Sequence, residues 1–130
     1  MEKIVIDSDI KNITLIEKLI DDISNQYDLH SDIYGKLLLA IVEGVNNAIV
    51  HGNKLDINKK VRLEYTITDK TLEFIIMDEG NGFDYSKIPD PTLPENVEKT
   101  HGRGIFLMNH LADEIEFENN GSTVKLIFDL

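Results

Sequence analysis

Two pairs of short alternating segments, each joined by a tight turn, limit the folds open to this chain of 130 residues. Apolar residues at every second position indicate strands with one buried face. The alternating positions are Val61, Leu63, Tyr65 and Ile67 with Leu72, Phe74 and Ile76, and then Ile115 and Phe117 with Val124, Leu126 and Phe128. Residues 68–71 turn the first pair, and residues 119–121 turn the second. Strands joined as adjacent hairpins predict a mixed or antiparallel sheet and argue against a doubly wound parallel one.

Two helices are expected between a short first strand, residues 3–6, and the first hairpin. Apolar residues at helical spacing predict a helix that ends near Tyr27, after a polar turn at residues 7–9 that can cap it. The same spacing predicts a longer helix from Ser31 almost to Gly52, where Gly52-Asn53 is a plausible stop. We therefore expect an α+β two-layer sandwich, with a mixed, mainly antiparallel sheet covered on one face by helices.

An irregular stretch separates the two hairpins. The loop Asp78-Glu79-Gly80-Asn81-Gly82 is too rich in glycine to extend a strand, and all three prolines follow it. A mobile lid is expected at about residues 84–103, followed by a short helix from Ile105 to about Ala112. We find no linker or repeat, so residues 1–130 are interpreted as one domain.

Charge and composition narrow the function classes. Thirteen basic against twenty-four acidic residues give a net charge of -11, which repels nucleic acid and anionic membranes. The absence of cysteine excludes disulfides and thiolate metal sites and is compatible with a reducing cytoplasm. No signal peptide is recognised, and no run is expected to approach membrane-spanning length. These features predict a cytoplasmic protein that binds neither nucleic acid nor membrane.

Glu43 and Asn47 are four residues apart on the second helix, so both side chains leave the same face. An amide oxygen suits magnesium, and a neighbouring carboxylate can accept a proton from an attacking hydroxyl. For an isolated pair, however, a solvated helix face is the commoner explanation. The same holds for Asp78 with Gly80 and Gly82, which can bring a carboxylate and close backbone to a ligand or form an ordinary turn.

Gly102-Arg103-Gly104 precedes the third predicted helix, and free amides at a helix N-terminus can bind phosphate. An ordinary glycine-containing loop is the alternative. No two of the four histidines form a close pair such as H-x-x-x-H, so structural zinc is not expected. His51 is interpreted as a packing or hydrogen-bonding residue at the helix end, and His101 as a solvated loop residue.

Together, these motifs in this order resemble the GHKL ATPase superfamily. Residues 43–52 look like its N box, residues 78–84 like its first glycine box, and residues 102–108 like its second, while residues 121–123 resemble its closing glycine-threonine element. Within the superfamily, the chain is most similar to the anti-sigma-factor serine kinases of bacterial partner-switching systems. The resemblance covers nearly the whole chain, but Gly44 stands where alanine is expected.

This resemblance implies roles for individual residues. Glu43 would be the general base, Asn47 would coordinate magnesium at the ATP phosphates, and Asp78 would bind adenine. Gly80, Gly82, Gly102 and Gly104 would line the nucleotide, and Thr123 would support the adenine side. Arg103 and Lys99 would add positive charge at the phosphates, on their location alone.

The resemblance also implies a function and partners. The domain would bind Mg-ATP, phosphorylate a STAS-type anti-sigma factor antagonist, sequester a sigma factor, and form a homodimer. Three alternatives stay open on the sequence: a non-catalytic module whose partner affinity is switched by ATP, an ATPase that attacks ATP with water, and an α/β domain that binds no nucleotide.

Overall fold

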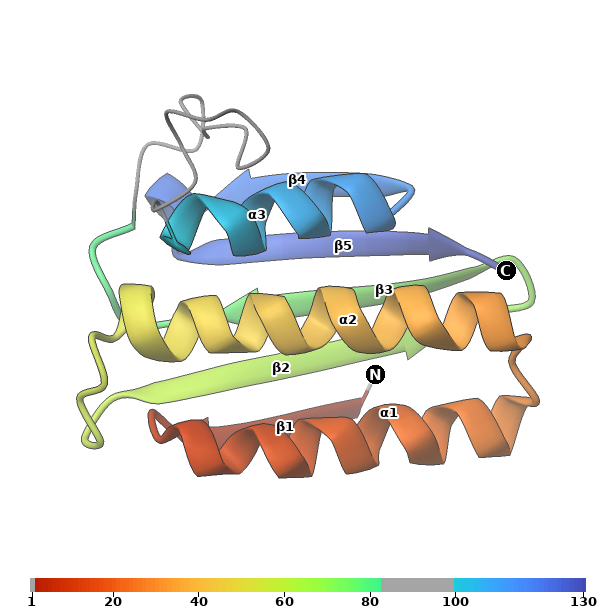
Figure 1. The fold of residues 1–130 in the computed structure, drawn as a ribbon, viewed down its shortest axis with the longest axis horizontal. Coiled ribbons are helices and arrows are strands. Elements are labelled where there is room, and N and C mark those ends of the chain that lie inside the picture. The colour runs from red at the N-terminus through yellow and green to blue at the C-terminus, as the bar shows by residue number, and fades with distance from the viewer. Residues whose placement is uncertain (1, 83–99) are drawn as a thin grey trace.

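The computed structural model describes residues 2–82 and 100–130, with side chains from Ile105 onward in the second range. Its elements run in the order β1 (Glu2–Asp7), η1 (Ile10–Asn12), α1 (Ile13–Tyr27), α2 (Ser31–Asn47), η2 (Ala48–Gly52), β2 (Lys60–Ile67), β3 (Thr71–Met77), α3 (Thr100–Leu111), β4 (Glu114–Glu118), η5 (Asn119–Gly121) and β5 (Thr123–Asp129). The three long helices lie in one layer over one face of the sheet, with α2 between α1 and α3 (Figure 1). The predicted two-layer α+β sandwich is confirmed.

The five described strands form one sheet in the order β1-β2-β3-β5-β4, and every neighbouring pair is antiparallel. Both predicted hairpins are present, with Tyr65 opposite Phe74 and Ile115 opposite Leu126. Within this sheet the antiparallel alternative therefore holds and no parallel pair occurs. Because β5 pairs with β3 in antiparallel orientation, the C-terminal end of β3 lies beside the N-terminal end of β5, with Met77 opposite Thr123.

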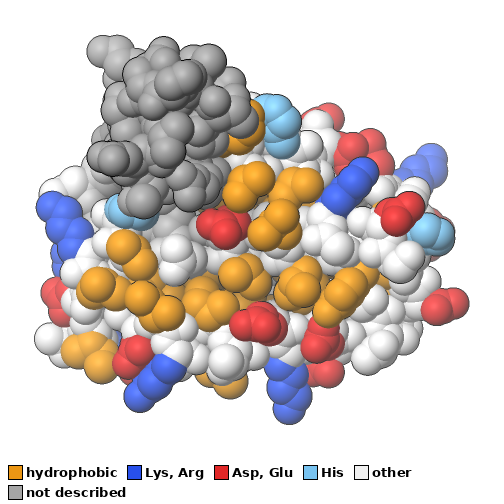
Figure 2. Space-filling view, in the orientation of Figure 1, with side chains coloured by type: hydrophobic (Ala, Val, Ile, Leu, Met, Phe, Trp, Pro, Cys, Tyr) orange, Lys and Arg blue, Asp and Glu red, His pale blue; other side chains and the backbone are white. Residues whose placement is uncertain are grey.

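The core lies between the sheet and the helices, as the sequence periods require. Most side chains at the predicted buried positions are almost fully enclosed, while Tyr65, Ile67, Ile115 and Phe117 are only partly buried. The enclosed ones are Ile16, Ile20, Ile23, Leu37, Ile41 and Val45 from the helices, and Leu63, Leu72, Phe74, Ile76, Leu126 and Phe128 from the strands. Burial of such apolar area is the main stabilising contribution to a domain of this size. Hydrophobic side chains also form a band across the outer surface of the helical face (Figure 2). Leu15 of α1 and Leu39 of α2 are among the exposed large hydrophobic residues.

Helix boundaries agree with the sequence at α1 and α2 but not at α3. Asp28 adopts a left-handed conformation directly after α1, and α2 passes into a π-helical turn, η2, that ends at Gly52. The third helix begins at Thr100 and not at Ile105, so the prediction was wrong by about one turn. No proline follows Pro94, and two glycines weaken a helix by only about 1 kcal/mol each without blocking it. The predicted lid lies outside the described residues except for residues 100–103, which belong to α3.

A second correction concerns the length of apolar helix. Within the described residues one helical stretch, Ser31–Gly52, is long and apolar enough to cross a membrane by length and composition, with a mean hydropathy of 1.4. The core helix of a soluble protein meets the same criterion. Here Leu37, Ile41 and Val45 of this stretch are buried in the core, so its apolar character is accounted for by packing in the domain.

Candidate functional site

A narrow cavity lies where α2 and η2 cross the ends of β3 and β5. Its lining comprises Gly44, Asn47, Ala48, Ile76, Asp78, Ile105, Phe117, Gly121, Ser122 and Val124. Asn47 and Asp78 therefore line one cavity, although they are 31 positions apart in the chain. Its volume is only about 10 Å³, enough for about one water. In this conformation the described walls form a recess smaller than an adenine ring.

Asp78 is fixed at the point where β3 ends. Its backbone N–H donates to the carbonyl oxygen of Ser122 at 2.9 Å, and its carboxylate oxygen Oδ1 accepts from the N–H of Gly80 at 2.8 Å. Among residues 2–82 and 105–130, the hydrogen bond of its side chain is made by Oδ1, so Oδ2 has capacity for another donor. Partial burial raises the pKa of the Asp78 carboxyl, and the Gly80 N–H and the charge of Lys59 oppose this shift.

The glycines around Asp78 are required by close contact. A methyl group on Gly52 would overlap the Asp78 carboxylate, and one on Gly80 would overlap the carbonyl group of Gly52. Gly82 has a φ of +82° and lies against the backbone of Asn120. Three glycines thus let the loop approach η2 and η5 more closely than side chains would permit.

Gly44 has a different environment. A methyl group there would lie 2.6 Å from Ile76 Cδ1 and 2.9 Å from Met108 Sδ, both at the ends of side chains. The departure from alanine noted in the sequence is therefore matched by tight packing between α2, β3 and α3.

These contacts predict a contrast between two alanine substitutions. Gly80→Ala should destabilise the fold by about 1–3 kcal/mol, because the overlapping Gly52 carbonyl is backbone and moves only with η2. Gly44→Ala should change the free energy of unfolding by less than about 1 kcal/mol, because the gain in helix propensity offsets a shift of flexible side-chain ends. Urea denaturation of both variants measures the difference. Equal losses would contradict the rigid contact assigned to Gly80.

The other predicted site residues with described positions lie near the cavity. Glu43 is half-buried one turn before Asn47 on α2 but does not line the cavity. Gly102 and Gly104 lie within the first turns of α3, next to the cavity residue Ile105. Thr123 is buried, and its hydroxyl bonds to the Asn119 side chain at 3.1 Å without lining the cavity.

Three predicted lid residues have no described side chain. Lys99 lies outside the described residues, and for His101 and Arg103 the structure gives only a helical backbone. His51, in contrast, lies in the last turn of η2 and is exposed. The expected contribution of the lid to phosphate binding therefore stays a prediction.

The donor set fits nucleotide-bound magnesium better than an independent metal site. Among the described residues no group of three or more histidine, cysteine, aspartate or glutamate side chains is placed to hold a metal. Magnesium commonly takes one or two protein oxygens and completes its shell with phosphates and water. Asn47 can supply one such oxygen, while the free capacity of Asp78 Oδ2 suits an amino N–H of adenine.

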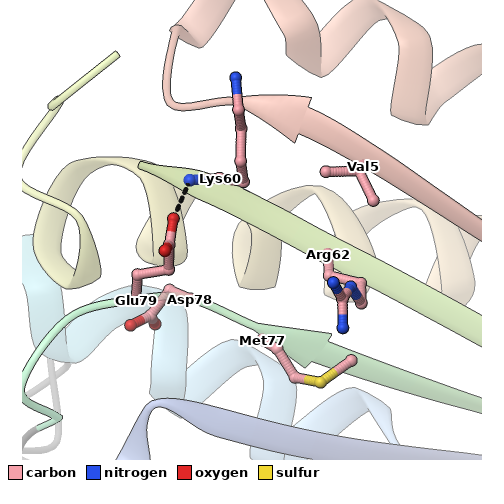
Figure 3. Close-up of a pocket in the computed structure, with 6 residues that line it drawn as sticks. All are labelled: Val5, Lys60, Arg62, Met77, Asp78 and Glu79. Carbon is pink, nitrogen blue, oxygen red and sulfur yellow. Dashed lines mark hydrogen bonds between the residues drawn. The ribbon is translucent and has the colours of Figure 1, made fainter. Parts of the chain in front are cut away.

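A second hollow lies on the helix-free face, behind Asp78 (Figure 3). It has a volume of about 270 Å³ and is lined by Val5, Lys60, Arg62, Met77, Asp78 and Glu79. Asp78 lines both hollows, but Asn47 lines only the one on the helical side. A ligand that contacts both predicted residues must therefore enter from the helical side.

Sequence reasoning missed a buried polar residue next to the site. Asn53 was interpreted only as a helix stop, and its backbone N–H does close η2 by donating to the Ala48 carbonyl at 2.8 Å. Its side chain is also buried and hydrogen-bonds to Ser8, Lys60 and Glu79. The sequence shows only that an asparagine directly follows the polar end of an apolar helix. It does not indicate which distant residues the Asn53 side chain contacts.

Comparison with known proteins shows the family to which this fold belongs. A solved histidine kinase domain, from the Erythrobacter litoralis EL346 blue-light activated histidine kinase, has the same fold at a TM-score of 0.51 and 16% identity. The alignment covers 93% of this chain and 59% of that one. The model of the histidine kinase-like ATPase domain matches residues 6–128, and the chain belongs to this family. The resemblance to the GHKL superfamily is thereby confirmed.

Curated relatives narrow the comparison. The chain is 32% identical over 97 residues to the serine-protein kinase RsbW of Bacillus subtilis (strain 168), an alignment that covers 69% of this chain and 61% of that protein. It is 27% identical over 119 residues to the serine-protein kinase RsbW of Bacillus licheniformis, covering 86% of this chain and 74% of that protein. The chain thus spans about three fifths of the length of the first relative and three quarters of the second.

Proposed function

We propose that this domain binds Mg-ATP and transfers its γ-phosphate to a serine or threonine of a STAS-type anti-sigma factor antagonist, and that it sequesters a sigma factor in its other state. The observation that supports this most directly is that Asn47 and Asp78 line one recess. Membership of the ATPase family and similarity to serine-protein kinases support the choice of phosphate transfer.

The roles proposed for the residues follow their positions. Asp78 accepts the adenine amino N–H through the oxygen not bonded to Gly80. Asn47 supplies an amide oxygen to the magnesium ion, which neutralises phosphate charge when bound. Glu43, one turn earlier on α2, accepts the proton of the substrate hydroxyl.

The backbone and lid complete the proposed nucleotide site. Gly80 and Gly82 line it from the loop after β3, and Gly102 and Gly104 from the start of α3. Lys99 and Arg103 add positive charge at the phosphates, and Thr123 supports the adenine side from β5.

Partner binding is proposed from the surface and the charge. The hydrophobic band on the helical face suits a protein partner, and a net charge of -11 disfavours nucleic acid (Figure 2). By family resemblance, we propose a cytoplasmic homodimer.

Phosphate transfer to a purified STAS-domain protein from the same genome tests the proposal. With γ-labelled ATP and magnesium, label is expected on a serine or threonine of that protein, and removal of magnesium with a chelator should prevent it. Release of ADP without labelled protein would instead identify an ATPase. ATP-dependent partner affinity without transfer would identify a binding module, and absence of ATP binding in calorimetry would reject a nucleotide site altogether.

A further inference from the structure

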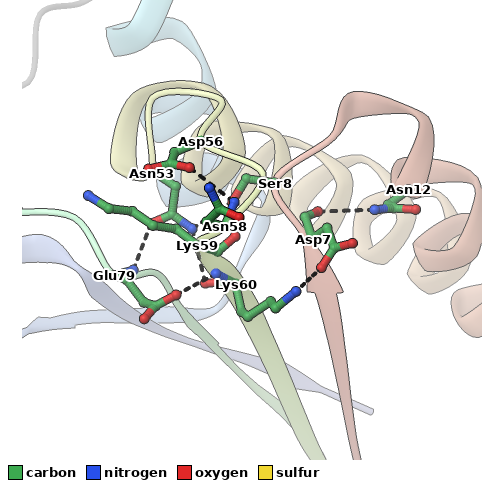
Figure 4. Close-up of polar contacts among 9 residues, drawn as sticks. All are labelled: Asp7, Ser8, Asn12, Asn53, Asp56, Asn58, Lys59, Lys60 and Glu79. Atoms are coloured by element: carbon green, nitrogen blue, oxygen red, sulfur yellow. Dashed lines mark hydrogen bonds and ion pairs between the residues drawn. The ribbon is translucent and has the colours of Figure 1, made fainter.

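A buried polar cluster behind the Asp78 loop has Asn53 at its centre (Figure 4). The Asn53 side chain is 1% exposed. Its Nδ2 donates to Ser8 Oγ at 2.8 Å and to the Lys60 carbonyl at 3.0 Å, and its Oδ1 accepts from the Glu79 backbone N–H at 2.7 Å. One amide thus joins the end of β1, the start of β2 and the loop after β3.

The bond from Glu79 connects this cluster to the recess. Glu79 directly follows Asp78, whose own N–H donates to the carbonyl of Ser122, the residue just before β5. The two peptide N–H groups on either side of the Asp78 Cα are therefore fixed, one by Ser122 and one by Asn53. The Lys60 backbone N–H also donates to the Glu79 carboxylate, so a second hydrogen bond joins Glu79 to the start of β2 (Figure 4).

Asn53 also positions the backbone of η2 that faces the Asp78 carboxylate. Its backbone N–H closes η2 on Ala48, which places the preceding residue, Gly52, against the Asp78 carboxylate and Gly80. The same residue therefore positions both the loop that carries the carboxylate and the backbone on which the carboxylate rests. A buried amide with its donor and acceptor both satisfied has a single favourable orientation.

From this geometry we infer that Asn53 is a positioning residue for adenine recognition, which acts by holding the Glu79 amide so that Asp78 presents its free oxygen to the recess. The inference rests on the proposed function of Asp78. It concerns recognition of the base and not the transfer step, because the Asn53 side chain has no hydrogen bond to Glu43 or Asn47 of α2 among the described residues.

Asn53→Ala should therefore remove the preference for ATP over inosine triphosphate, which carries a carbonyl oxygen in place of the adenine amino group. The wild-type protein is expected to prefer ATP by at least about tenfold, because a buried hydrogen-bonding group rejects a ligand that leaves it unpaired. The variant should lose about tenfold in ATP affinity, with its affinity for inosine triphosphate unchanged. Calorimetric titration with each nucleotide gives both values.

Two further variants separate positioning from stability. Ser8→Ala removes a hydroxyl from the same buried cluster without touching Glu79, so it should lower the melting temperature but keep the ATP preference. Asn53→Asp keeps an oxygen acceptor for the Glu79 N–H and should also keep the preference, even if it is less stable. Asn53→Asp decides the question if Asn53→Ala does not fold.

Hydrogen exchange provides a readout that needs no nucleotide. In Asn53→Ala the Glu79 amide should exchange at least about tenfold faster than in the wild type, while core amides such as that of Ile76 stay protected. Ser8→Ala should leave the Glu79 amide protected.

The outcomes distinguish the two proposals. If the wild-type protein binds ATP no better than inosine triphosphate, the role proposed for Asp78 fails and this inference fails with it. If the wild type prefers ATP and folded Asn53→Ala prefers it equally, the inference alone is overturned. It is also overturned if Asn53→Asp and Ser8→Ala lose the preference for ATP as completely as Asn53→Ala does.

Discussion

Glu43→Ala is expected to reduce phosphate transfer by about 10²- to 10⁴-fold, the range typical of a removed general base, with little change in the affinity for ATP. Glu43 lies on α2 one turn before Asn47 and does not line the recess shared by Asn47 and Asp78. Loss of its carboxylate therefore removes the proton acceptor but leaves the proposed adenine and magnesium contacts in place. Single-turnover transfer at saturating ATP and calorimetry of ATP binding measure the two effects separately.

Two further substitutions make this result specific. Glu43→Gln preserves size and hydrogen bonding but cannot take up a proton, so it should be as impaired as the alanine variant. Asp32→Ala removes a carboxylate from the first turn of the same helix, where it is exposed, and should transfer phosphate normally. If ATP affinity falls as far as transfer in Glu43→Ala, the side chain organises magnesium or the helix and is not the base.

The sheet and the helix faces could be predicted because each depends on a local period. Alternation from Val61 to Ile67 fixes which side of β2 is buried, and the turn at residues 68–71 fixes its register with β3. The position of β5 between β3 and β4 could not be predicted in this way, because strand order depends on the packing of segments that are distant in the sequence.

Parts of the site escaped prediction for the same reason. The need for glycine at position 80 arises from the carbonyl of Gly52, a contact between residues 28 positions apart. The bonds of Asn53 reach Ser8 and Glu79, neither of which has a spacing that reveals the partner. The convergence of Asn47 and Asp78 was predictable only through the order of the family motifs, and the narrowness of the recess was not predictable at all.

Asp78→Asn is expected to weaken ATP binding and to stabilise the folded protein at neutral pH. In the variant the amide oxygen can still accept from the Gly80 N–H, but an NH₂ group then replaces the carboxylate oxygen proposed to accept from the adenine amino group. Loss of a hydrogen bond to a charged group costs about 1.5–3 kcal/mol, or roughly tenfold to a hundredfold in affinity. The stability should move the other way, because a half-buried charge is removed from the fold.

The pH dependence gives the sign of the stability change. Burial raises the pKa of the Asp78 carboxyl in the folded state above its ordinary value of 3.8, so the folded state binds this proton more tightly than the unfolded state. The resulting stabilisation is fully present below pH 3.8 and is lost as the pH rises through the higher folded-state pKa. Asparagine does not titrate, so the stability advantage of the variant over the wild type should grow as the pH rises through this window.

Urea denaturation of both proteins from pH 4 to 7 measures this difference, with Asp69→Asn in the exposed β2–β3 turn as the control that should change neither stability nor binding. A variant that is less stable than the wild type at pH 7 would mean that the bond from Gly80 to the charged oxygen outweighs burial. A variant that gains stability yet binds ATP as tightly as the wild type would remove Asp78 from the adenine site. Only the combination of higher stability and weaker binding fits a carboxylate that is kept charged in the recess for its ligand.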